Sequence, residues 1–170
     1  MEKVMNRIIN WRYEKWDNNE KNNDKKYSED DISDYISWEI YPEDIELFIT
    51  VLAPRTIIYK GCVIRCKNEN KKQSICQRFD SWLLQGKDLH IAQAQINMCS
   101  IADIFLNTSE NTSDSTIENL ANLIKDNWEL HLQKTYPDRD FVVYIAGEGV
   151  DLVVIFFEQT LPSEIELYDS

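Results

Sequence analysis

Apolar side chains recur at helical spacing through residues 115–134. Positions at this spacing share one side of an α-helix and form a stripe that packs inward. Ser115, followed three residues later by Glu118, forms a capping box, so we expect the helix to begin at Ser115. Pro137 ends it. The positions of the stripe are Ile117, Leu120, Ala121, Ile124, Trp128 and Leu132.

Two β-hairpins are predicted from short apolar runs on either side of tight turns. Residues 141–145 and 151–157 read as strands around a turn at 146–149, directly after the long helix. Residues 56–66 predict a second hairpin, in which Lys60 and Gly61 form a two-residue turn.

Further helices are predicted from apolar spacing and from helix-start signals. They cover residues 2–16, residues 28–40 with a capping box at Ser28, residues 42–51 with Pro42 in the first turn, and a short segment that ends at Gly86. In that short helix we expect Ile75, Phe79, Trp82 and Leu83 to face inward.

The pattern of residues 87–106 does not decide between helix and strand. A helix could begin at Asp88, residues 94–98 alternate like a strand, and Ser100 could cap one further helical turn. One continuous helix is the alternative.

Together these elements predict an α+β fold. We expect a largely antiparallel sheet of about five strands, including the two hairpins, with three to five helices packed on one face. A chain of 170 residues is long enough for one domain without disulfide or metal support. Residues 1–170 are therefore taken as a single domain. Residues 17–26 carry no apolar side chain, so residues 1–26 are expected to be an appended helix followed by a mobile charged loop.

The net charge of −12 is unevenly distributed. Residues 101–170 hold 14 acidic and three basic side chains, and no Lys or Arg lies between Tyr27 and Pro54. Such a balance argues against nucleic-acid binding, which depends on basic side chains that neutralise phosphates. It permits a basic protein partner. The alternative is that the charge serves solubility alone.

Candidate chemistry is sparse. The four cysteines fit no standard zinc spacing, although Cys62, Cys66, Cys99 and His90 could in principle meet. The four glycines form no phosphate-binding loop. A pairing of Cys76 or another thiol with His90 or His131 is neither supported nor excluded. We expect no metal, no cofactor and no catalytic residues.

The sequence shows no signal peptide and no apolar run long enough for a membrane span. We therefore expect a cytoplasmic protein that does not engage a membrane, with its thiols reduced.

A resemblance rests on a few segments. The helix with Trp128, the turn and strand at 136–143, the strand that ends at 156–159 and the hairpin at 60–62 resemble the C-terminal half and middle of small bacterial α+β proteins. Size, acidity, asparagine content and the missing catalytic motifs resemble immunity proteins of contact-dependent and polymorphic toxin systems. The resemblance implies a protein that binds and neutralises one cognate toxin domain.

We expect the partner to be basic and to meet one of two acidic sets. One set is Glu29, Asp30, Asp31 and Asp34, and the other is Asp138, Asp140, Glu148 and Asp151 around the ends of the second hairpin. The loop 136–140 is interpreted mainly as a structural turn. Two other hypotheses remain: an enzyme whose site is not visible in sequence, and a structural or adaptor domain.

Overall fold

The computed structural model describes residues 40–106 and 112–160. The chain divides into two compact units, Met1–Phe48 and Ile49–Ser170. The helices predicted at 2–16 and 28–40, and the loop at 17–26, lie outside the described residues. Helix α3 (Pro42–Leu52) begins at Pro42 as predicted and ends two residues before Pro54.

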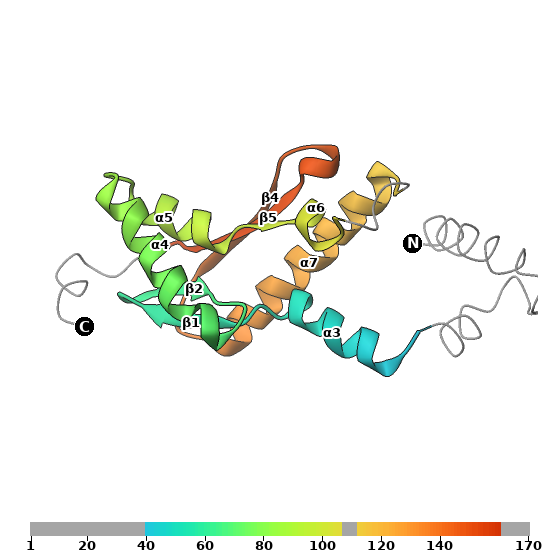
Figure 1. The fold of residues 1–170 in the computed structure, drawn as a ribbon, viewed down its shortest axis with the longest axis horizontal. Helices are drawn as coiled ribbons and strands as arrows, with labels where there is room; N and C mark the ends of the chain where they lie inside the picture. Colours follow the sequence, from blue (N-terminus) through green and yellow to red (C-terminus); the bar gives the residue numbers. More distant parts are fainter. Residues whose placement is uncertain (1–39, 107–111, 161–170) are drawn as a thin grey trace, which may run out of the picture. The chain divides into compact units, whose positions relative to one another are not determined.

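The second unit interleaves helices with short strands (Figure 1). In chain order they are β1 (Thr56–Tyr59), β2 (Cys62–Arg65), η2 (Glu69–Lys71), α4 (Lys72–Leu84), α5 (Leu89–Asn97), β3 (Cys99–Ser100), α6 (Ile101–Ile104), α7 (Asp114–Thr135), β4 (Phe141–Ala146), η3 (Gly149–Asp151) and β5 (Val153–Glu158).

The fold class is α+β and all strand pairs are antiparallel, as predicted, but the strands form two sheets rather than one. One sheet pairs β1 with β2, and the other has the order β3-β5-β4. The prediction of a single sheet was wrong because side chains of α5 lie between β2 and β5, where backbone pairing would otherwise join the sheets.

The first hairpin has the predicted turn. Lys60 and Gly61 both have positive φ, at 48° and 74°, as the mirror-image two-residue turn requires. Side chains of β2 alternate between two cores: Val63 packs into a core with α7, β4 and β5, whereas Ile64 packs with Phe79, Ala92 and Ile96 of α4 and α5. The hairpin therefore contributes to both clusters.

The N-cap of helix α7 lies two residues earlier than predicted. Ser113, not Ser115, is the N-cap, and its hydroxyl accepts a hydrogen bond from the Thr116 N–H at 3.3 Å. The capping box was misplaced because Ser113 and Ser115 both precede an acidic or polar first turn. The apolar stripe is confirmed: Ile117, Ala121, Ile124, Trp128 and Leu132 are buried, and Leu120 is half-buried.

Residues 88–106 form short helices around a two-residue strand. Asp88 caps α5 by accepting from the His90 N–H, and Ser100 caps α6, as predicted. Of the alternatives left open at 94–98, the structure shows helix and not strand, because residues 94–97 continue α5. The alternation at 94–98 arises because Ile96 faces the core while Asn97 faces the β5 edge.

Candidate functional site

A buried polar cluster fixes α5 against the edges of two strands. Gln93 and Asn97 are four residues apart, so both point to the same side of α5. The Asn97 amide donates to the Phe156 carbonyl of β5 at 3.2 Å, and the Gln93 carbonyl oxygen accepts from the Glu158 N–H at 3.0 Å. Beyond Val154, where pairing with β3 stops, these side chains thus take the place of a neighbouring strand.

The same cluster binds the free edge of β2. The Val63 N–H donates to Glu158 Oε2 at 2.8 Å, and the Val63 carbonyl accepts from both Gln93 and Asn97. The Arg65 N–H donates to Asn97 Oδ1 at 2.7 Å. Because every buried polar atom named here has a partner, the cluster holds the two sheets in a fixed relation.

Glu158 is the buried charge of this cluster, with 2% of its surface exposed. Arg139 Nη1 lies 2.5 Å from Glu158 Oε1 and also donates to the Gly61 carbonyl at 2.7 Å. The segment 136–140 is therefore the structural turn that was favoured, and it positions Arg139. Burial, together with the negative charge of Glu158, raises the pKa of the nearby Cys62 thiol to about 12, against a smaller opposing effect of Arg139.

The thiols predicted as possible ligands do not converge. Cys62 lies in the core with Phe79, whereas Cys99 lies in the core with Trp128. The Cys66 thiol donates to the Asn68 carbonyl, and the His90 ring packs edge-on against Phe157. In residues 40–106 and 112–160, no three His, Cys, Asp or Glu side chains are grouped so that they could hold a metal ion.

The predicted acidic residues are divided by the structure. Glu29, Asp30, Asp31 and Asp34 lie outside the described residues. Asp138 and Asp140 precede β4, whereas Glu148 and Asp151 lie in the turn that joins β4 to β5. A six-residue strand separates these pairs, which is roughly 20 Å at 3.4 Å per residue. The second predicted set is therefore two sites at opposite ends of the hairpin.

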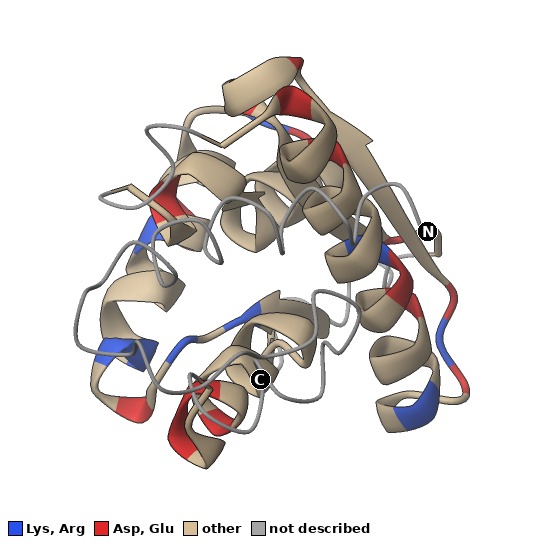
Figure 2. Cartoon of the chain, turned by 90° about the vertical axis from the view of Figure 1, so that its right-hand side faces the viewer, with Lys and Arg blue, Asp and Glu red and all other residues tan. Residues whose placement is uncertain are grey.

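Two further carboxylates join Glu148 and Asp151. Helix η3 of the β4–β5 turn contacts both α6 and α7, which brings Asp103 and Asp114 to the same region. All four carboxylates are exposed. We call Asp103, Asp114, Glu148 and Asp151 the acidic end; acidic positions mark the β4–β5 turn at the top of Figure 2.

The grouping of the acidic end was not predicted from sequence, although one signal was available. Residues 88–124 contain no Lys or Arg, and neither do residues 140–170. These two cation-free stretches supply all four carboxylates, and the fold brings the stretches together. Gly147 shapes the turn: its φ is +88°, and a Cβ there would lie 2.5 Å from the Asp151 carbonyl oxygen.

An apolar sheet face lies beside the acidic end. The register of β4 and β5 places Val143 and Phe156 on the face that packs against α7, where Trp128 meets Phe156 edge-on. Alternation puts Tyr144 and Phe157 on the opposite face. We call this opposite face the outer face; its side chains are Val142, Tyr144, Ala146, Val153, Ile155 and Phe157.

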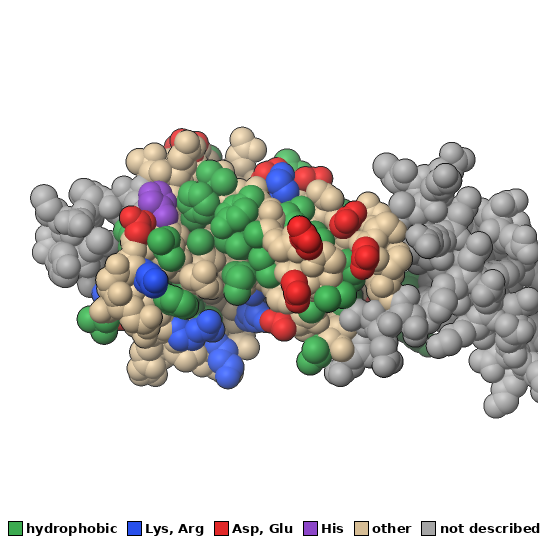
Figure 3. All heavy atoms as spheres, turned by 90° about the horizontal axis from the view of Figure 1, so that it is seen from above, with side chains coloured by type: hydrophobic (Ala, Val, Ile, Leu, Met, Phe, Trp, Pro, Cys, Tyr) green, Lys and Arg blue, Asp and Glu red, His purple; other side chains and the backbone are tan. Residues whose placement is uncertain are grey.

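The outer face is only partly buried. All of its side chains except Ile155 remain half-buried, and neighbouring Met98 is 39% exposed. Seen from above, apolar side chains gather in the middle of the described surface, with acidic side chains on the right and basic side chains along the lower edge (Figure 3). The described chain thus presents apolar side chains that are bordered on one side by carboxylates.

Comparisons of the chain with protein-family models, with curated proteins and with solved structures gave no match. Among the described helices, none combines the length and the apolar character needed to cross a bilayer.

Proposed function

We propose that this protein is a non-enzymatic, immunity-type protein of the cytoplasm that binds and neutralises a cognate, basic toxin domain. The observation that supports the proposal is the outer face with the acidic end beside it. An apolar centre bordered by charged groups is the usual arrangement of a protein–protein interface.

The charge of the acidic end suits a basic partner in particular. Asp103, Asp114, Glu148 and Asp151 lie in two stretches without Lys or Arg, and the cations that border these stretches are Lys87, Lys125 and Arg139. Toxin domains that cleave nucleic acid need basic grooves to hold phosphates. Carboxylates that enter such a groove would exclude the substrate, while the outer face supplies the apolar contact.

The experiment combines survival with stoichiometry. The chain is co-expressed with candidate toxin fragments, first those encoded by neighbouring genes, and host growth is measured. The purified toxin is then titrated with the purified chain. A binding inhibitor reaches full inhibition at one chain per toxin and forms a 1:1 complex on size exclusion. Inhibition by far less than one chain per toxin would show an enzyme and overturn the proposal.

Matched variants locate the interface. Glu148→Lys/Asp151→Lys should weaken inhibition, whereas Asp138→Lys/Asp140→Lys, which changes net charge equally at the other end of the hairpin, should not. Tyr144→Ser tests the outer face independently of charge. Full inhibition by both the Glu148/Asp151 and the Tyr144 variants would contradict this surface as the binding site.

A further inference from the structure

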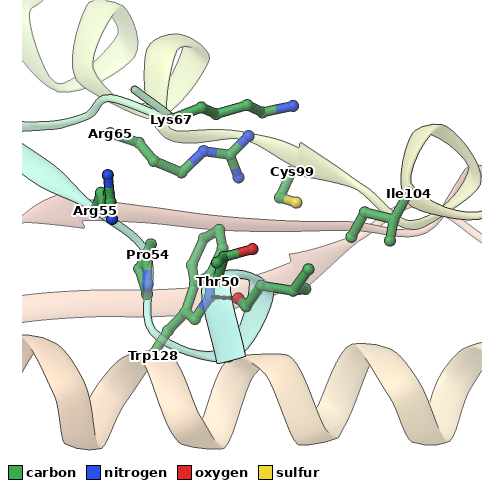
Figure 4. Close-up of a pocket in the computed structure, with 9 residues that line it drawn as sticks. Thr50, Pro54, Arg55, Arg65, Lys67, Cys99, Ile104 and Trp128 are labelled. Atoms are coloured by element: carbon green, nitrogen blue, oxygen red, sulfur yellow. Dashed lines mark hydrogen bonds between the residues drawn. The ribbon is translucent and has the colours of Figure 1, made fainter. Parts of the chain in front are cut away.

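A separate pocket of about 380 Å³ opens between the end of α3, β2, β3 and α7. Its apolar lining comes from Val51, Pro54, Cys99, Ile104 and Trp128, and Thr50 adds a hydroxyl. Figure 4 shows the Trp128 ring standing in the pocket below the Cys99 thiol. All of these residues belong to the second unit.

Three cations complete the lining: Arg55, Arg65 and Lys67. No Asp or Glu is among the lining residues. Elsewhere, Lys60, Lys125 and Arg139 each pair with a carboxylate, but in the described ranges no carboxylate forms an ion pair with any cation of the pocket. Three cations that pair with no described carboxylate thus line one pocket in a chain of net charge −12.

The central cation is held in place. The Arg65 guanidinium lies 5.4 Å from the centre of the Trp128 ring, within the range of a cation–π contact. The backbone N–H of Arg65 donates to Asn97 Oδ1 of the buried polar cluster. Trp128 is fixed in turn, because its indole N–H donates to the Val51 carbonyl at 2.7 Å. These contacts therefore hold the Arg65 guanidinium and the Trp128 ring in position at the wall of the pocket, where a ligand can bind.

We propose that this pocket binds a small amphiphilic anion, with a carboxylate or phosphate head group against Arg55, Arg65 and Lys67 and an apolar body against Val51, Ile104 and Trp128. Like charges that line one pocket repel one another, and an anion between them reduces that repulsion while it accepts charge-assisted hydrogen bonds from the guanidinium groups. The pocket volume is that of about thirteen liquid waters at roughly 30 Å³ each, which suits an anion with a short chain or a single ring. This site is independent of the proposed toxin interface.

The test uses sodium octanoate as the amphiphilic probe, with octanol and inorganic phosphate as partial probes, each measured by calorimetric titration of the full chain. We expect saturable binding of one octanoate per chain, with octanol and phosphate each at least tenfold weaker. No saturable binding of octanoate would overturn the proposal. If octanol bound as tightly as octanoate, the cations would have no role in binding. If phosphate bound as tightly as octanoate, the apolar lining would have none.

The variants separate the pocket from general charge. Arg55→Gln/Lys67→Gln removes two exposed cations whose side chains form no hydrogen bond within the described residues, so folding should be preserved. It should weaken octanoate binding at least tenfold. Lys71→Gln/Lys87→Gln changes the net charge equally outside the pocket and should leave binding unchanged. Equal weakening by both double variants would show nonspecific attraction and contradict a site at the pocket.

Discussion

Gln93 and Glu158 bind each other twice: the Gln93 amide donates to Glu158 Oε2 at 2.8 Å, and its carbonyl oxygen accepts from the Glu158 N–H at 3.0 Å. The second bond is of the kind that a neighbouring β-strand would make. The Gln93 side chain therefore occupies the edge of the three-stranded sheet. It also donates one of the hydrogen bonds that the buried Glu158 carboxylate needs.

Gln93→Leu should destabilise the protein by roughly 2–4 kcal/mol, because it leaves the buried Glu158 N–H without an acceptor and removes a hydrogen bond to a charged group. Urea unfolding measures the free energy. Gln95→Leu, on the same helix but half-buried, is the control and should change the free energy little. Equal effects of the two variants would mean that the reciprocal bonds contribute nothing.

Trp128→Ala should cost roughly 3–5 kcal/mol, the range for a large buried aromatic side chain. Trp128 is 1% exposed, meets Phe156 edge-on and donates to the Val51 carbonyl. Trp128→Phe keeps most of the apolar volume and should cost less. Thermal and urea unfolding check both variants, and a near-wild-type midpoint for the alanine variant would contradict the central place of this side chain in the core.

Stability should fall above pH 9, in part because of Cys62. Burial raises its pKa from 9.0 to about 12 in the folded chain, so between these values the unfolded state has lost a proton that the folded state keeps. The contribution is complete below pH 9 and is lost as pH rises through that window. One such proton changes the free energy of unfolding by about 1.4 kcal/mol per pH unit.

Cys62→Val should therefore lose less stability than wild type between pH 8 and pH 10.5, whatever its packing cost at pH 8. Tyr59, whose pKa is raised from 10.0 to about 12 by burial and by its hydrogen bond to Asp80, adds to the loss of stability above pH 10. The Tyr59→Phe/Cys62→Val double variant should flatten the dependence further. Urea unfolding under reducing conditions measures it; a variant-to-wild-type difference that stays constant with pH would contradict the assignment.

Sequence patterns predicted the elements whose side-chain spacing reports burial directly. The stripe through Ile124 and Trp128 and the turn at Lys60–Gly61 are local signals, and both are confirmed. The division into two sheets is not local. It depends on hydrogen bonds from Gln93 and Asn97 to β2, about 30 residues earlier in the chain, and to β5, about 60 residues later. Two amide side chains on a helix form no sequence pattern from which these partners could be predicted.

For the candidate sites too, local features could be predicted from the sequence, whereas groupings of distant residues could not. Glu148 and Asp151 were predicted, but their neighbours Asp103 and Asp114 come from other helices that only the fold brings to the same turn. The pocket cations were missed because Arg55, Arg65 and Lys67 alternate with apolar residues in a hairpin, where single exposed charges are ordinary.

The last prediction concerns the rate at which the proposed toxin is captured. Exposed carboxylates that face a basic partner raise the association rate, and salt screens this effect. We expect the wild-type on-rate to fall by about tenfold or more as ionic strength rises from low to high, within the range known for steered association. Stopped-flow mixing with the purified toxin fragment measures it.

Glu148→Lys/Asp151→Lys should slow association at low salt and reduce its salt dependence, with a smaller effect on dissociation, since charges at the edge of an interface act mainly on encounter. Asp138→Lys/Asp140→Lys is the matched control, because these carboxylates flank Arg139 at the far end of the hairpin. If the control slows association as much as the Glu148/Asp151 variant, the attraction comes from net charge and not from the acidic end. If the wild-type on-rate ignores salt, electrostatic capture is wrong even where a 1:1 complex forms, and the outer face alone would then have to account for binding.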